Sequence, residues 1–141
     1  MIYGGFMKVL IIDGQGGKLG ALITESIIKE KIDCELYAVG TNVLATSAML
    51  KAGADNAATG ENPVKVLSSD ADVIIGPIGI TVADALLGEV TPAMAVAVGQ
   101  SRATKLLLPV SHCNNKVIGV RNLSMGDMVK ETVETLKNIV L

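Results

Sequence analysis

Residues 9–20 read Val-Leu-Ile-Ile-Asp-Gly-Gln-Gly-Gly-Lys-Leu-Gly, and this stretch decides the fold. Four apolar residues in a row, closed by an aspartate and a glycine cluster, are typical of a strand buried on both faces. From residue 17 to residue 31, apolar residues recur at steps of three and four, which predicts a helix with one apolar face toward a sheet. A buried strand, a glycine loop and an amphipathic helix in this order are typical of an α/β fold.

Strands and helices are expected to alternate along the rest of the chain. Further strands are expected at residues 35–39, 54–57, 72–75, 105–110 and 117–120, and helices at 43–52, 62–68 and 125–140, with two short helices starting near 81 and 91. Only six residues precede the strand at 117–120, too few for a parallel crossover, so this strand is expected to be antiparallel. The pattern predicts a three-layer, doubly wound, mostly parallel sheet of about six strands.

Length and composition exclude several classes of protein. The 141 residues are expected to form a single domain, residues 1–141, and the 50% hydrophobic content is enough to form a core. A net charge of −2 and 2% aromatic residues argue against a nucleic-acid partner. The longest apolar stretch is too short for a membrane span and no secretory signal is visible, so a cytoplasmic location is expected. Met7 is a second candidate for the natural start.

The glycine loop after the first strand is the strongest chemical signal in the sequence. Its spacing is G-x-x-G-x-x-G and resembles the loop of extended short-chain dehydrogenases. Such a loop offers backbone N–H groups and a helix N-terminus to a phosphate group. The cofactor-binding residues predicted here are Gly14, Gln15, Gly16, Gly17 and Gly20. In the alternative interpretation the glycines serve only a tight turn and close helix packing.

The sequence does not specify which nucleotide binds. A dinucleotide site needs an acidic residue near the end of the second strand, where this chain has Gly40, Thr41 and Asn42. Glu35 starts that strand and is therefore expected at the opposite edge of the sheet. Neither NAD nor NADP is specified, and the cofactor stays unknown. Tyr-x-x-x-Lys and Walker A motifs are absent, and one histidine with two separated cysteines predicts no metal site. No catalytic residue is identified.

Small polar residues follow most of the predicted strands, at the edge where open α/β sheets bind ligands. The residues expected beside the cofactor are Thr41, Asn42, Gly76, Pro77 and Gly79, and those expected near a substrate are Asp13, Thr59, Asn62, His112 and Asn114. Each has a structural alternative. The Asn and Thr side chains can cap helices, and Asp13 can bond the N–H groups of the glycine turn, which we favour. His112 could transfer a proton or lie in a solvated loop.

Four runs of sequence resemble a bacterial family of domains of unknown function. They are residues 13–17, residues 40–50 apart from 43 and 44, residues 58–62 and residues 72–79. The resemblance covers nearly the whole chain and implies a single domain without an assigned reaction. A wider likeness to Rossmann-type binding domains implies a Rossmann-like fold and nucleotide binding.

Two functions remain open on the sequence alone. The first is binding of a nucleotide, dinucleotide or other phosphorylated small molecule at Gly14–Gly20, for which a bulky residue in place of Gly17 is expected to abolish binding and leave the fold intact. The second is a non-catalytic interaction or sensor module with a structural glycine loop. Residues 92–98 are apolar all round, so this helix must be buried on more than one side. A subunit interface or burial under the two C-terminal elements could achieve this, and a homo-oligomer is expected.

Overall fold

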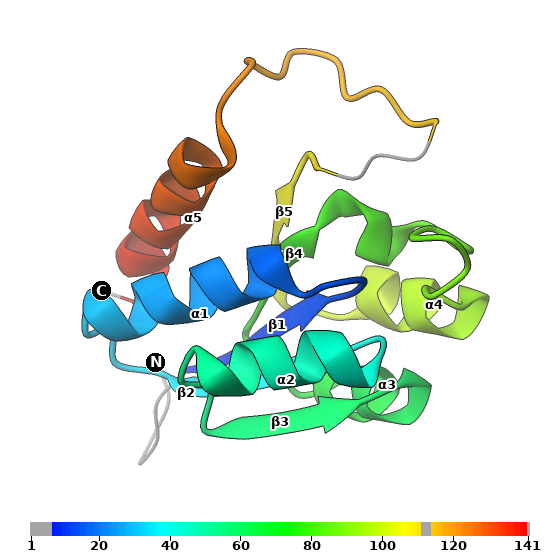
Figure 1. Cartoon of the computed structure of the whole chain (residues 1–141), viewed down its shortest axis with the longest axis horizontal. Coiled ribbons are helices and arrows are strands. Elements are labelled where there is room, and N and C mark those ends of the chain that lie inside the picture. Colours follow the sequence, from blue (N-terminus) through cyan, green and yellow to red (C-terminus); the bar gives the residue numbers. More distant parts are fainter. Residues whose placement is uncertain (1–6, 111–113, 141) are drawn as a thin grey trace.

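A parallel sheet of five strands forms the centre of the structure, a computed structural model that describes residues 7–110 and 114–140 (Figure 1). All four neighbouring pairs of strands are parallel. The strands lie in the order β3 (Asn56–Thr59), β2 (Glu35–Gly40), β1 (Lys8–Asp13), β4 (Val73–Pro77) and β5 (Thr104–Leu108). The chain moves away from β1 in one direction through β2 and β3, and in the other through β4 and β5. The ends of β1 and β4 therefore lie at the switch point of the sheet, the place at which such sheets bind ligands.

Helices cover both faces of this sheet (Figure 1). One face carries α1 (Lys18–Lys29), α2 (Val43–Lys51) and α5 (Met125–Val140), and the other carries α3 (Glu61–Ser68) and α4 (Pro92–Gln100). The side chains of β1 alternate between the two faces, as a strand requires. Val9 and Ile11 pack into the core under α1 and α5, whereas Leu10 and Ile12 pack into the core under α3 and α4. The expected α/β fold with helices on both faces is confirmed.

The helix starts were predicted with mixed success. The side chains of Asn42 and Thr91 cap α2 and α4, where they accept the backbone N–H groups of Ala45 and Met94. The helix expected to begin at the Asn62-Pro63 pair instead begins one residue earlier, after Gly60, whose φ of 105° breaks the preceding strand conformation. Asn62 is therefore an exposed residue of the first turn of α3 and not its cap.

The predicted antiparallel strand at residues 117–120 is wrong, and the sheet has five strands instead of six. Residues 114–124 arch away from the sheet before the chain enters α5 (Figure 1). Ile118 is 92% exposed, so this apolar run buries almost nothing. Gly119 has a φ of 85°, which interrupts the extended backbone that a strand needs. Without a buried face, β-branched residues do not fix a strand.

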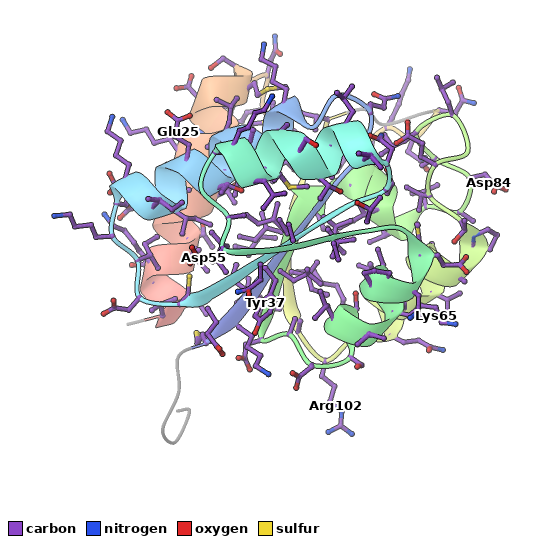
Figure 2. The ribbon with its side chains drawn as sticks, turned by 60° about the horizontal axis from the view of Figure 1, so that its bottom comes forward. Glu25, Tyr37, Asp55, Lys65, Asp84 and Arg102 are labelled. Atoms are coloured by element: carbon purple, nitrogen blue, oxygen red, sulfur yellow. The ribbon has the colours of Figure 1, made fainter. Side chains whose placement is uncertain are left out.

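The short helix expected near residue 81 is also wrong. Residues 78–81 form a single 3-10 turn, η1, and residues 82–91 form a series of turns that we name the 82–91 segment. Thr81 Oγ1 donates to the carbonyl of Ile78 and does not accept from residue 84. Asp84, Leu86 and Leu87 all have positive φ, which excludes a right-handed helix. Asp84 projects away from the body of the molecule at the outer edge of this segment (Figure 2).

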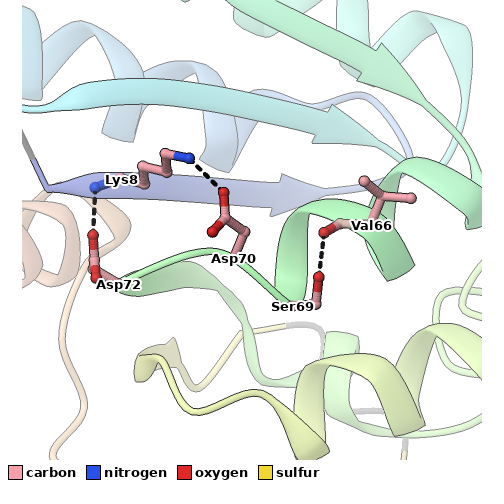
Figure 3. A network of polar contacts seen from close by, with 5 residues as sticks. All are labelled: Lys8, Val66, Ser69, Asp70 and Asp72. Carbon is pink, nitrogen blue, oxygen red and sulfur yellow. Dashed lines mark hydrogen bonds and ion pairs between the residues drawn. The ribbon is translucent and has the colours of Figure 1, made fainter. Parts of the chain in front are cut away.

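The edge of the sheet at the start of β1 has a structural role (Figure 3). The backbone N–H of Lys8 donates to Asp72 Oδ2 over 2.8 Å, and the Lys8 ammonium forms an ion pair with Asp70. Ser69 Oγ donates to the carbonyl of Val66 in the last turn of α3. The two Lys8 contacts attach the connection between α3 and β4 to the central strand, and the Ser69 bond closes the end of α3. The candidate site lies at the opposite edge, where the strands end.

Candidate functional site

The carboxylate of Asp13 lies beneath the glycine loop, at the end of β1. Its side chain is 6% exposed, and its two oxygens accept the N–H groups of Gly14 over 2.8 Å and Gly20 over 2.7 Å. Burial raises the pKa of Asp13 above its ordinary value, and the nearby charge of Glu89 acts in the same direction, against the two backbone hydrogen bonds. Asp13 therefore holds the turn and the first turn of α1, which is the structural interpretation expected for it.

A second carboxylate, that of Glu89, reaches the loop from the 82–91 segment. Its Oε1 atom accepts hydrogen bonds from the Gln15 N–H over 2.8 Å, from Thr41 Oγ1 over 2.6 Å and from Asn42 Nδ2 over 2.8 Å. Asn42 Nδ2 also donates to the carbonyl of Gln15 over 2.9 Å. The end of β2, the glycine loop and the connection after β4 thus meet at one oxygen atom.

Glu89 was not among the predicted site residues, because it lies in a stretch predicted to be helical. Only Asp84 and Glu89 are acidic between β4 and β5, and this signal could have identified a carboxylate near the switch point. Partial burial pushes the pKa of Glu89 upward, but the hydrogen bonds from Thr41, Gln15 and Asn42 together hold it below its ordinary value. Glu89 is consequently an anion at neutral pH.

The lowered pKa of Glu89 predicts a pH-dependent stability difference between the wild type and Glu89→Gln. The stabilisation is present above the pKa of the unfolded chain, about 4.3, and is lost as the pH falls through the lower folded-state value. We expect the wild type to exceed Glu89→Gln by about 1 kcal/mol in free energy of unfolding at pH 7, a modest value because the carboxylate is partly solvated. Urea unfolding at several pH values measures the difference, which should shrink below about pH 4.3.

A matched control for this prediction is Asp84→Asn. It removes the same charge from the same segment, but the Asp84 side chain is exposed and has no hydrogen bond within the described residues. Its free energy of unfolding at pH 7 should stay within about 0.5 kcal/mol of the wild type. A wild-type advantage over Glu89→Gln that is the same at every pH would contradict the assignment of these bonds to an ionised carboxylate.

Three backbone N–H groups at the loop remain open. Those of Gly16, Lys18 and Leu19 have no acceptor within the described part of the chain. A Cβ atom built at Gly16 would meet nothing within 4 Å, so the loop is open to solvent at that residue. The N-terminus of a helix carries a partial positive charge, and the exposed Lys18 adds a full one. The arrangement can accept an anion.

Close packing explains most of the other glycines. A Cβ atom would lie 2.5 Å from Thr41 Oγ1 at Gly14, 2.6 Å from Ala45 Cα at Gly17, 2.6 Å from Met49 Sδ at Gly20 and 2.4 Å from the Ile12 carbonyl oxygen at Gly76. Gly17 also has a φ of 73°. The expectation that a bulky residue at Gly17 would leave the fold intact is therefore wrong, because the substitution would push α1 away from α2.

The remaining predicted rim residues lie apart from the Glu89 contacts. Gly76 and Pro77 are buried within β4, and the buried Gly79 belongs to η1, so these residues do not form the open turn that was expected. Thr59 Oγ1 shares a hydrogen bond with Thr46 Oγ1 over 2.7 Å, which attaches β3 to α2. Asn62 and Asn114 are exposed and make no hydrogen bond to Glu89 in the described ranges. His112 lies outside the described residues.

No group of three or more His, Cys, Asp or Glu side chains is arranged to hold a metal ion in the ranges 7–110 and 114–140. In the same ranges, none of the helices combines the length and apolar character that a bilayer crossing requires.

Comparisons with known proteins identify a family. No curated protein matches the sequence. Among solved structures, a Bacillus thuringiensis protein provisionally assigned as an NADPH:quinone reductase is similar, with a TM-score of 0.42 and 18% identity. The match covers 96% of this chain but 46% of that protein, so this chain spans about half of its length. The family model described as "Domain of unknown function (DUF3842)" matches residues 8–141, and the chain belongs to this family.

Proposed function

We propose that this domain binds a nucleotide, a dinucleotide or another phosphorylated small molecule at the loop Gly14–Gly20. The observation that carries the proposal is the set of unpartnered N–H groups of Gly16, Lys18 and Leu19, in a loop that is open to solvent at Gly16. Backbone donors at a helix N-terminus bind phosphate because they point at the ligand and the helix dipole favours negative charge. Their position after β1, at the switch point, agrees with ligand binding in open α/β sheets.

Binding to this loop predicts a stabilised protein in the presence of the right ligand. A thermal-shift panel of NAD(H), NADP(H), ATP, GTP, CoA and S-adenosylmethionine, confirmed by calorimetry, measures it. A ligand at about 100 times its dissociation constant adds roughly 2.7 kcal/mol, which should raise the melting temperature of a domain of this size by roughly 5 to 10 °C. The cofactor class follows from the compound that produces the shift.

Gly16→Leu is the variant that blocks the loop without disturbing the fold. The new side chain extends from an open position of the loop, next to the unpartnered N–H groups. We therefore expect the affinity for the bound ligand to fall roughly tenfold or more and the unfolding free energy to stay within about 0.5 kcal/mol. Gly99→Leu makes the same change at an open glycine in α4 and should bind like the wild type. Unchanged affinity in Gly16→Leu would contradict the proposed site.

A specific observation also favours the second candidate, a non-catalytic interaction or sensor module. Gly14, Gly17 and Gly20 are all accounted for by packing, which needs no ligand. The outer surface formed by α3 and α4 exposes Val66 by 57% and Val96 by 53%, the kind of apolar surface that a second copy of the chain could cover. No shift across the panel, together with an oligomer in light scattering, is the result expected of this candidate.

A further inference from the structure

The Glu89 carboxylate occupies a position that a bound phosphate would compete for. Its Oε1 atom accepts the N–H of Gln15, the loop donor adjacent to the open N–H of Gly16. A Cβ atom built at Gly14 would lie 2.9 Å from the same oxygen, so the carboxylate lies directly against the loop backbone. An anion from the chain itself therefore already uses part of the donor set of the proposed site.

We propose that Glu89 is an internal anion that occupies one donor of the glycine loop, the N–H of Gln15, and that a phosphate-bearing ligand binds the loop by displacing it. The inference rests on the proposed function, because displacement of Glu89 has a consequence only if the loop binds a ligand. In this inference Glu89 determines which anions can bind to the loop.

The charges around the loop favour displacement of Glu89 by an anionic ligand. The Asp13 carboxyl group accepts the N–H groups of Gly14 and Gly20. The Glu89 carboxylate, which accepts the N–H of Gln15, adds a negative charge to the same loop. A phosphate group brought to the neighbouring donors meets repulsion from Glu89 for as long as that carboxylate stays in place. Once Glu89 moves away, the Gln15 N–H becomes a further donor beside those of Gly16 and Lys18.

The side chain of Glu89 can move while its backbone stays in place. Leu86 and Val90 on either side are 2% and 1% exposed and belong to the core under α3 and α4, so they anchor the segment. Glu89 itself is only partly buried, so its side chain is in contact with solvent. Rotation of the carboxylate into solvent breaks its hydrogen bonds to Thr41 and Asn42 without breaking the core. A ligand must offer more hydrogen bonds than it removes, which favours a diphosphate over a single phosphate group.

The experiment compares pyrophosphate and ADP binding by the wild type, Glu89→Gln and Asp84→Asn in calorimetry at pH 7. We expect Glu89→Gln to bind pyrophosphate roughly tenfold or more tightly than the wild type, because the variant removes both the repulsion and a charge-assisted competitor. Asp84→Asn, which has the same net charge, should stay within about twofold of the wild type, because long-range electrostatics at an exposed site are screened. Urea unfolding verifies that both variants are folded.

The outcomes separate this inference from the proposed function. Binding that is equal or weaker in Glu89→Gln overturns the inference and leaves the phosphate site standing, and weaker binding would show that ligands use Glu89 as a partner. No binding of either probe by any of the three proteins overturns both. A direct readout of displacement is the NMR signal of the Asn42 side-chain amide, which should shift when saturating pyrophosphate removes its bond to Glu89. Binding with no change in that signal overturns the inference as well.

Discussion

Gly17→Val is expected to unfold at much lower urea concentration than the wild type, with a loss of about 3 kcal/mol or more in free energy of unfolding. Two costs add at this position. The backbone has a φ of 73°, which a β-branched residue rarely adopts, and the new Cβ would lie 2.6 Å from Ala45 Cα and 2.9 Å from its carbonyl oxygen. Neither contact can relax by a side-chain rotation, because both are with the backbone of α2.

Gly16→Ala is the matched control one residue away in the same loop. A Cβ there meets nothing within 4 Å, so the free energy of unfolding should change by no more than about 0.5 kcal/mol. Circular dichroism during urea titration measures both variants. A Gly17→Val protein as stable as Gly16→Ala would mean that α1 and α2 do not approach each other as closely as the structure has them.

Leu136→Ala should lose about 3 kcal/mol of stability, within the range of roughly 2 to 5 kcal/mol seen for buried leucines. Leu136 is fully buried on α5, where it lies with Val129 and Val133 in the core shared with α1 and β1. Its removal leaves a cavity in the contact that attaches the C-terminal helix to the sheet. Thermal and urea unfolding should both report the loss.

Ile118→Ala removes nearly the same number of apolar atoms from a side chain that is 92% exposed. Its free energy of unfolding should stay within about 0.5 kcal/mol of the wild type. A loss comparable to that of Leu136→Ala would show that residues 117–120 are buried in solution, either against β5 of the same chain or in a contact between copies.

Local patterns in the sequence predicted much of this fold. The run of residues 9–12 predicted a strand buried on both faces, and the structure places alternate residues of β1 in the two cores. The three- and four-residue spacing of apolar residues predicted α1 and α5 within two residues at each end. These predictions succeeded because the periodicity of a buried face repeats within a few residues and needs no information about distant contacts.

The wrong predictions concern segments whose conformation depends on contacts with distant parts of the chain and not on neighbouring residues. Residues 117–120 have the composition of a strand but obtain no partner, since a strand is fixed by pairing and burial that its own sequence cannot supply. The helix expected near residue 81 is replaced by turns in which Leu86 has a positive φ, and the burial of Leu86 and Val90 under α3 and α4 outweighs the local pattern.

The same distinction between local and distant contacts applies to the candidate site. Its glycine loop, the cap of Asn42 and the turn held by Asp13 were predicted because each is made within a few residues of one strand end. Glu89 could not be predicted, because its bond to Gln15 joins residues 74 positions apart and exists only when the sheet brings the ends of β1, β2 and β4 together. The sequence by itself therefore determined the loop and its N–H donors. Only the packed sheet brings the Glu89 carboxylate to them, because contacts between distant segments depend on the order of the strands and not on any local pattern.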